Sequence, residues 1–304
     1  MIVRGTEKHT AGIRECIRKS YTMEDPRYFE YFFRHLYKPE YFYVDTENQT
    51  VAACICRIPH DVMFNGRILR MSMLSLACTM PEYRNEGRIR RLIETTLDAC
   101  EHSELITLVP GEYSEAYREY RFQPIYFRSE YTVSRDGSRR VTTIGCAYEP
   151  NPVDMLDVYA EFIKRFNGFY ARDVEYFANL KREIAARGGK IVAYYNEKDK
   201  IQGYATILIS GREVTVEECV YLNSMALNKL ISAAMQERAT VHLRVSDAEN
   251  LLRLFPNAVK VTYPSVLARL NDAALFSRLF NAEVNDIKAA YDISQLPLNL
   301  NERI

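Results

Sequence analysis

Hydrophobic and polar positions in the first third of the chain switch between the two-residue period of strands and the longer period of helices. Residues 1–6 alternate like a short strand, and residues 9–21 place apolar side chains at helical spacing. Strand-like runs follow at 41–45, 51–58 and 68–79. Asn65 and Gly66, between the last two runs, are typical of a tight hairpin turn. The pattern predicts a strand, then helical segments, then an antiparallel meander.

The clearest helical pattern in the chain comes after the last of these runs. Apolar residues recur at helical spacing from Ile89 to Cys100, and an aromatic-rich helix is predicted between Pro26 and Pro39. Proline suits the first turn of a helix, and a later proline ends it. The first half then closes with a strand, a short helix and a strand, at 105–109, 113–120 and 124–133.

The second half of the chain partly repeats this order of elements. A polar stretch at 134–138 is typical of a linker between domains. Strands are then predicted at 141–147, 190–195, 202–209, 213–220 and 241–245. Helices are predicted at 153–166, 173–186 and 223–238. We therefore predict two mixed α/β domains, 1–137 and 138–304, a division that also suits the length of the chain.

The charge balance narrows the classes of partner. Lys plus Arg and Asp plus Glu each number 40, so the chain has no global positive field that would attract nucleic acid or anionic lipid. The start of the chain is polar by Arg4, and no apolar run is long enough to span a bilayer. We therefore expect a cytoplasmic protein that has neither nucleic acid nor membrane as a partner.

The cysteines and histidines show no spacing that is typical of a metal site. The seven cysteines form no Cys-x-x-Cys pair, and the five histidines form no ligand-spaced group. Cys54 and Cys56 lie two apart in a predicted strand and so share one face, where they would hold a metal only with ligands from elsewhere. We expect reduced thiols that act as small apolar side chains, and no structural metal.

One turn has the features of an anion site. It joins a long predicted strand to the clearest helix and consists of Arg84, Asn85, Glu86, Gly87, Arg88 and Ile89. Free backbone N–H groups and the helix dipole favour an anion there, and a glycine allows close approach. The two arginines add positive charge. The alternative is an ordinary solvated and capped turn, and the turn by itself does not decide between the two.

Neighbouring residues decide for the anion site because together they resemble a known family. The turn resembles the pyrophosphate loop of the GNAT superfamily of N-acetyltransferases, Arg/Gln-x-x-Gly-x-Gly/Ala. The segment from Ser75 to Arg84 resembles the approach to that loop, and Tyr117–Phe122 resembles the family's Tyr-x-x-x-Gly-Phe. The resemblance implies tandem GNAT-like domains, each with a mostly antiparallel central sheet flanked by helices, and acetyl-CoA as cosubstrate.

Within the superfamily, the chain is most similar to the enhanced-intracellular-survival (Eis-like) branch. That branch joins two GNAT domains to a sterol-carrier-like domain, and the segment 264–272 resembles the end of its second GNAT copy. The resemblance implies that this chain ends where the third domain would begin. It also implies that the second copy is degenerate, because Glu217 and Glu218 end a predicted strand without a phosphate loop after them.

The family resemblance assigns roles to particular residues. Ala77, Cys78 and Thr79 occupy the strand whose bulge holds the pantetheine arm, and the turn from Arg84 to Ile89 holds the pyrophosphate. Tyr117 matches the tyrosine that acts as general acid toward the leaving thiolate. Two positions depart from the pattern: Ile89 replaces Gly or Ala, and Arg121 replaces Gly.

The expected reaction is acetyl transfer from acetyl-CoA to the amine of a small molecule or peptide, without a covalent enzyme intermediate. The sequence does not identify the general base; the Ile304 carboxylate, Glu24 and Asp25 are candidates. Because Ile89 and Arg121 depart from the family pattern, one alternative is a sensor or scaffold protein that binds acyl-CoA with little or no catalysis. An interaction module without CoA binding is a third alternative, and a homo-oligomer stays open.

Overall fold

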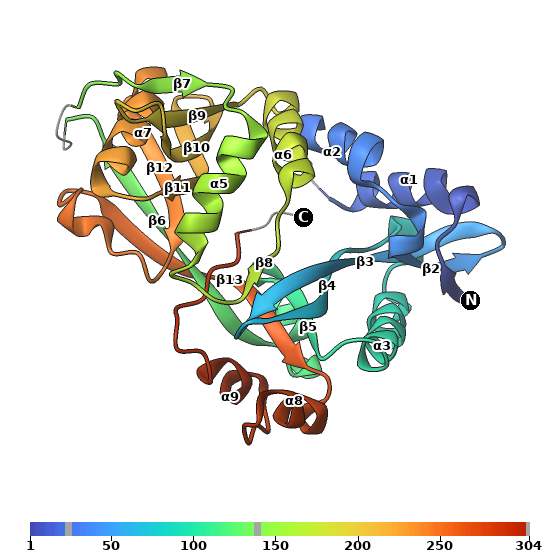
Figure 1. The fold of residues 1–304 in the computed structure, drawn as a ribbon. Coiled ribbons are helices and arrows are strands. Elements are labelled where there is room, and N and C mark those ends of the chain that lie inside the picture. Colours follow the sequence, from blue (N-terminus) through green and yellow to red (C-terminus); the bar gives the residue numbers. More distant parts are fainter. Residues whose placement is uncertain (22–25, 137–140, 302–304) are drawn as a thin grey trace. The chain divides into compact units, whose positions relative to one another are not determined.

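The computed structural model describes residues 1–21, 26–136 and 141–301, and it divides them into two compact units (Figure 1). The first unit contains the described residues up to 125 together with 264–295. The second contains those from 126 to 263 together with 296–301. No helix among the described residues is long and apolar enough to cross a bilayer.

The first unit is built on a mostly antiparallel sheet with the strand order β1-β2-β3-β4-β5-β13. Its strands are β1 (Ile2–Arg4), β2 (Phe42–Glu47), β3 (Thr50–Phe64), β4 (Arg67–Thr79), β5 (Ile106–Pro110) and the C-terminal part of β13 (Val259–Leu270). The β4–β5 pair is parallel, and the other neighbours are antiparallel.

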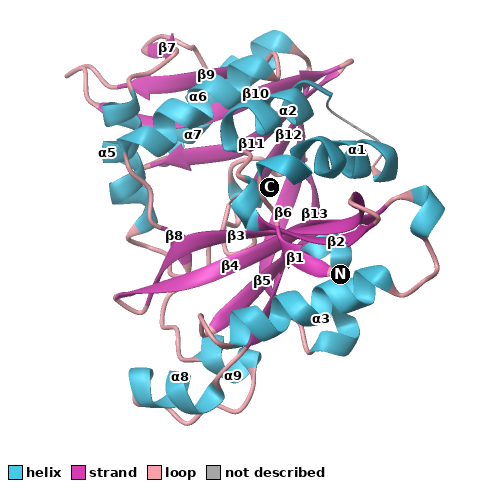
Figure 2. Cartoon of the chain, turned by 90° about the vertical axis from the view of Figure 1, so that its right-hand side faces the viewer, coloured by secondary structure: helices cyan, strands magenta, loops and turns pink. Residues whose placement is uncertain are grey.

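Helices cover both faces of this sheet. They are α1 (Thr10–Ser20), α2 (Pro26–Tyr31), α3 (Arg88–Glu101), α4 (Ser114–Tyr117), α8 (Ala273–Phe280) and α9 (Ile287–Asp292). Alternate residues of β3 point to opposite faces: Ala53 and Ile55 pack with α3, whereas Cys54 and Cys56 pack with α1. Figure 2 shows α1 and α3 on either side of β2–β4. The two-residue period of β3 therefore builds two separate cores.

An aromatic cluster holds the C-terminal helices in the first unit. Phe64, at the end of β3, lies 6.2 Å from Phe276, 5.5 Å from Phe280 and 5.0 Å from Tyr291 between ring centroids. Aromatic pairs at this separation contribute about 0.5–1.5 kcal/mol beyond the area that they bury. Residues 264–295 thereby become part of a unit whose other strands lie early in the chain.

The second unit repeats the sheet of the first. Its strands are β7 (Cys146–Tyr148), β9 (Lys190–Tyr195), β10 (Ile201–Ser210), β11 (Glu213–Tyr221), β12 (Thr240–Ser246) and β6 (Gln123–Ser134), in that spatial order. Again only the fourth and fifth strands of this order, β11 and β12, pair in parallel. Its helices are α5 (Pro152–Ile163), α6 (Val174–Ala186) and α7 (Ser224–Glu237), and β8 (Phe169–Tyr170) is a short strand.

Each sheet takes its last strand from the other half of the chain. Residues 266–270 of β13 pair with 106–110 of β5, and residues 128–134 of β6 pair with 240–246 of β12. The units are therefore not the contiguous halves 1–137 and 138–304 predicted from the sequence. The predicted fold class, a mostly antiparallel sheet flanked by helices, is confirmed for both units.

Candidate active site in the first unit

A bulge interrupts β4 close to its C-terminal end. One residue of β3, Ile55, faces two residues of β4, Leu76 and Ala77, and Leu76 has a positive φ of 50°. A bulge of this kind leaves backbone groups of the extra residue outside the ladder. The bulge lies where the family resemblance implies one, next to Cys78 and Thr79.

The end of α1 is tied to this bulge. Tyr21 Oη donates to the Ala77 carbonyl oxygen at 3.0 Å, and Ser20 Oγ donates to the Thr79 carbonyl oxygen at 3.1 Å. These two bonds satisfy the carbonyls on either side of Cys78 from the α1 side. Sequence reasoning missed both residues, since nothing in their spacing relates them to β4.

The parallel strands β4 and β5 separate beside the bulge. Their pairing in the described structure covers 71–73 and 106–108, yet β4 continues to Thr79. Unpaired edges of parallel strands leave backbone groups available to a ligand that lies between them. The part of β4 that is not paired with β5 therefore includes the bulge and continues to Thr79.

The predicted phosphate turn forms the N-terminus of α3. Asn85 and Gly87 both take positive φ, at 66° and 70°, and Gly87 is the residue that precedes the helix. The Arg91 N–H bonds to the Gly87 carbonyl at 3.2 Å, so the N–H groups of the preceding three residues lack a partner within the helix. They are oriented for an anion, with the positive end of the helix dipole behind them.

The sequence predicted that the Arg88 side chain adds positive charge to the anion site, but acidic side chains hold it in the structure. Its guanidinium lies 3.1 Å from Asp45 and 2.7 Å from Glu86, and it also bonds to Glu47. It further lies over the Tyr83 ring, 5.0 Å from the centroid. These acids neutralise its charge and fasten the turn to β2. Arg88 therefore positions the turn, and its backbone N–H remains in the first helical turn.

The other predicted residues of the turn lie close to this frame. Arg84 is exposed, and its Nε donates to the Thr79 carbonyl oxygen at 3.4 Å, which connects the turn to the end of β4. Asn85 and Glu86 are exposed, whereas Ile89 is half-buried and packs on the core under α3. The Ile89 side chain thus points partly into the protein rather than across the helix start.

Tyr117 has a buried, unsatisfied hydroxyl in the core under α3. Its side chain is 2% exposed and packs on the same core cluster as Ala77 and Ile89. Its Oη is buried without a hydrogen-bond partner, which is uncommon because such a group costs about 1–3 kcal/mol. Burial raises the pKa of this hydroxyl above its usual value. Tyr117 therefore remains protonated at neutral pH and can donate to a ligand.

Arg121 adopts the backbone conformation that the family pattern assigns to glycine. Its φ is 65°, in the left-handed region, and its side chain is exposed. A residue with a Cβ costs about 1–2 kcal/mol in this region. We predict that Arg121→Gly raises the free energy of unfolding by about 1 kcal/mol, because the relief of strain exceeds the added flexibility of the unfolded chain. Urea denaturation tests this, and an unchanged or lower midpoint would contradict it.

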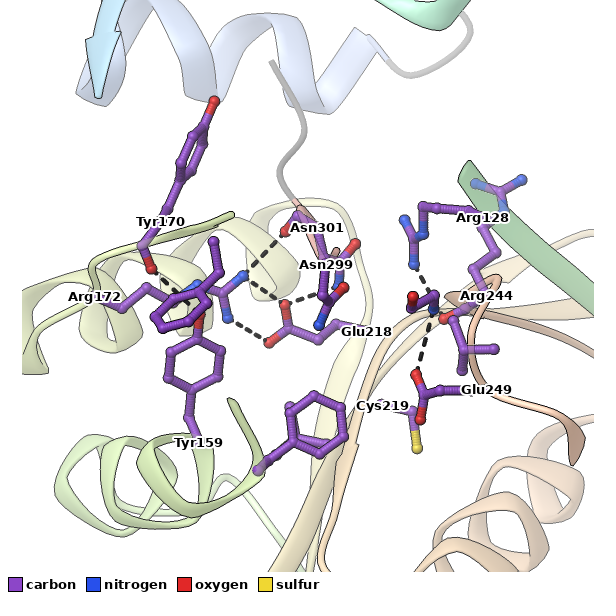
Figure 3. A pocket seen from close by; sticks show the side chains of 15 residues that line it. Arg128, Tyr159, Tyr170, Arg172, Glu218, Cys219, Arg244, Glu249, Asn299 and Asn301 are labelled. Carbon is purple, nitrogen blue, oxygen red and sulfur yellow. Dashed lines mark hydrogen bonds and ion pairs between the residues drawn. The ribbon is translucent and has the colours of Figure 1, made fainter. Parts of the chain in front are cut away.

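The corresponding place in the second unit is a pocket lined by charged side chains, Arg128, Arg172 and Glu218 among them (Figure 3). Here too a bulge interrupts the fourth strand, because Thr206 of β10 faces both Glu217 and Glu218 of β11. The Glu218 carboxylate is buried and pairs with Arg172 at 2.8 Å, and it accepts from Tyr204 Oη. The bulge is thus occupied by an internal ion pair.

Arg128 spans the two parallel strands of the second unit. Its guanidinium donates to the Glu217 carbonyl oxygen at 2.6 Å and to the Arg244 carbonyl oxygen at 3.0 Å. Burial lowers the pKa of this guanidinium. Two residues, Leu222 and Asn223, join β11 to α7, whereas residues 80–87 join β4 to α3. The second unit therefore lacks the phosphate turn, and Arg128 takes the backbone acceptors beside the bulge.

The suggested general bases lie outside the described residues. Glu24 and Asp25 fall between the described ranges, and Ile304 lies after residue 301.

Comparison with known proteins supports the resemblance of the N-terminal half of the chain to GNAT acetyltransferases. Residues 2–144 match the family model of the acetyltransferase (GNAT) domain. No curated protein matches the sequence of the chain at a significant level.

Solved structures with the same fold extend over nearly the whole chain. A protein of Enterococcus faecalis V583 described as a probable N-acyltransferase has a TM-score of 0.74 at 18% identity, and the match covers 89% of this chain and 72% of that one. A GCN5-related N-acetyltransferase of Anabaena variabilis has a TM-score of 0.73 at 17% identity, with 91% and 74% covered. Eis1 of Mycobacterium abscessus has a TM-score of 0.67 at 12% identity, with 91% and 75% covered.

Residues 2–144 are therefore similar to an acetyltransferase (GNAT) domain. The chain as a whole shares the fold of larger N-acetyltransferases, Eis1 of Mycobacterium abscessus among them.

Proposed function

We propose that the first unit transfers an acetyl group from acetyl-CoA to a primary amine of a small molecule or peptide. The observation that carries this proposal is the buried, unpartnered hydroxyl of Tyr117, which packs on the same core cluster as the bulged strand. A hydroxyl that donates to no group of the protein can give its proton to a leaving group. The GNAT family match supports the reaction class.

The proposed binding mode follows the backbone of the first unit. The first-turn N–H groups of α3 bind the pyrophosphate of acetyl-CoA, and Gly87 leaves room for its close approach. Arg84 contributes the exposed positive charge, because Arg88 is held by acids. The bulge at Ala77, with Cys78 and Thr79 after it, holds the pantetheine arm and the acetyl carbonyl through backbone groups.

The proposed chemistry is direct attack. The neutral amine forms a bond to the acetyl carbonyl carbon, and the carbon–sulfur bond then breaks. Tyr117 Oη gives its proton to the departing sulfur, the amine loses a proton to solvent, and Tyr117 regains a proton from solvent, so protons and charges balance over the cycle. General acid assistance of this kind contributes about 10²–10⁴-fold to a rate.

The second unit, in this proposal, is a degenerate copy without a cofactor site. Arg128 and the pair of Glu218 with Arg172 occupy its bulge, and the two-residue connection before α7 leaves no phosphate turn. Its role is to complete the fold, since it exchanges a strand with the first half of the chain.

A second candidate function is acyl-CoA binding without transfer. Arg121 favours it, because an arginine stands where the family has Gly, four residues after the proposed acid Tyr117. This candidate predicts that acetyl-CoA binds to the chain but that no amine is acetylated.

The experiment that tests the proposal measures release of the CoA thiol from acetyl-CoA with a thiol-reactive dye. A panel of amines should include polyamines, aminoglycosides and peptides with a free N-terminus or lysine. We expect amine-dependent release with at least one class, and an acetylated product by mass spectrometry. Binding of acetyl-CoA without release for any amine would favour the binding protein, and absence of both would overturn the proposal.

A further inference from the structure

Three cysteines that are far apart in the sequence converge in the first unit. Cys16 comes from α1, Cys54 from β3 and Cys78 from β4, and all three are buried. Their Sγ atoms lie within 4.8 Å of one another, with 3.4 Å between Cys54 and Cys78 and 3.4 Å between Cys78 and Cys16. Within the described ranges, no other three side chains with Cys, His, Asp or Glu donors are grouped in this way.

The geometry of this cluster matches a metal centre. With metal–sulfur bonds of about 2.3 Å, the sulfurs of a tetrahedral or trigonal site lie roughly 3.8–4.0 Å apart. Two of the observed separations, 3.4 Å each, are shorter than that value, so an ion would draw these two pairs slightly apart; the third is at most 4.8 Å. A fourth donor is close at hand, because Ser20 lies one helical turn after Cys16 on α1.

The donor chemistry selects the class of ion. The cluster offers three thiols and a hydroxyl but no carboxylate or imidazole. Such a set of donors suits soft thiophilic cations and disfavours the hard ions Mg²⁺ and Ca²⁺. A divalent ion leaves a smaller net charge in this buried place than a monovalent ion would, because three thiolates carry three negative charges. The ordinary alternative is that buried cysteines pack as small apolar side chains.

We propose that Cys16, Cys54 and Cys78 form a binding site for one soft divalent cation of the zinc group, Zn²⁺ or Cd²⁺. Binding forms three metal–sulfur bonds and releases three thiol protons to solvent, with no change in oxidation state. Sequence reasoning expected no structural metal, because it considered Cys54 with Cys56. The structure instead brings Cys54 together with Cys78 and Cys16 from two other elements.

An ion bound to the three cysteines would connect three elements of the first unit. The ion would join α1 to β3 and β4, and Cys78 directly follows the bulge. The existing contacts of Ser20 and Tyr21 with β4 would be reinforced by covalent-strength bonds. A ligand that binds only the folded chain raises its stability in proportion to the logarithm of its concentration.

The test uses the reduced full chain and Cd²⁺ as the probe. Titration should produce a near-ultraviolet sulfur-to-cadmium charge-transfer band that saturates at one ion per chain, with a rise in melting temperature. Cys16→Ser, Cys54→Ser and Cys78→Ser should each weaken or abolish the band. Cys56→Ser, which changes a buried thiol two residues from Cys54, and Cys146→Ser, which changes the half-buried one, should keep it.

A measurement on the wild type covers the case in which the serine variants do not fold. X-ray absorption at the cadmium edge should show three sulfur neighbours. A folded wild type without the charge-transfer band would overturn the proposal. So would a band that persists in the three variants, or a cadmium ion with fewer than three sulfur neighbours. None of these readouts depends on acetyl transfer.

Discussion

Tyr117→Phe is expected to lower the turnover of acetyl transfer by about 10²-fold while leaving the folded protein intact. The hydroxyl that it removes is buried and has no partner, so its loss deprives no other group of a hydrogen bond. The free energy of unfolding should stay the same or rise by about 1 kcal/mol, since an unsatisfied buried hydroxyl is itself unfavourable. Steady-state kinetics and urea denaturation of the same preparations measure both effects.

Tyr131→Phe is the matched control for this prediction. Tyr131 is also fully buried, but its hydroxyl donates to the Glu249 carbonyl oxygen at 2.9 Å and accepts from the Leu251 N–H at 3.3 Å. Its loss should cost about 1–3 kcal/mol of stability and leave turnover unchanged. Unchanged turnover in Tyr117→Phe would show that another group protonates the sulfur.

Gly87→Trp is expected to weaken acetyl-CoA binding by about 10²-fold or more, because the pyrophosphate contacts and the dipole of α3 become inaccessible. Only the end of the Arg91 side chain, at 3.8 Å, lies within 4 Å of a Cβ built on Gly87. The indole therefore projects into the space in front of the helix rather than into the core. Equilibrium binding of acetyl-CoA measures the effect.

Gly66→Trp separates this effect from backbone strain. Gly66 has a φ of 74°, close to the 70° of Gly87, and a Cβ there meets nothing within 4 Å. It lies in the turn before β4, at the opposite end of that strand from the bulge. In both variants the new side chain strains the backbone by about 1–2 kcal/mol. An equal loss of binding in both would place the cofactor elsewhere.

The elements that the sequence predicted well are those with strong local signals. Amphipathic spacing predicted a helix at 89–100, and α3 spans 88–101. Asn65 and Gly66 predicted the turn between β3 and β4, and the two-residue period predicted β9 at its observed bounds. Such signals depend on neighbours within a few residues, so a single sequence contains them.

The features that were missed depend on long-range pairing. Residues 266–270 pair with 106–110, a partnership without a local trace, and it moves α8 and α9 into the first unit. The helices α8 and α9 were not predicted, although Asp272 and Asp286 are typical helix caps.

Only part of the site was predicted, because some of its contacts also join residues that lie far apart in the sequence. The turn at 84–89 and the bulge near Ala77 lie where the family resemblance implies them, and the structure brings Tyr117 onto the same core cluster. Adjacency to Gly87 suggested that Arg88 faces an anion. Asp45 and Glu47 of β2 instead hold it, and their proximity arises only from the fold. The roles of these residues in binding and catalysis stay predictions.

Calorimetric titration of the full chain with acetyl-CoA tests most directly whether the first unit is the one working cofactor site. We predict saturable binding at one site per chain, because the turn before α3 is open while Arg128 and Glu218 occupy the equivalent place in the second unit. The same titration of Gly87→Trp should show no comparable binding. A folded wild type that binds no acetyl-CoA, or that binds two molecules with equal affinity, would contradict this assignment.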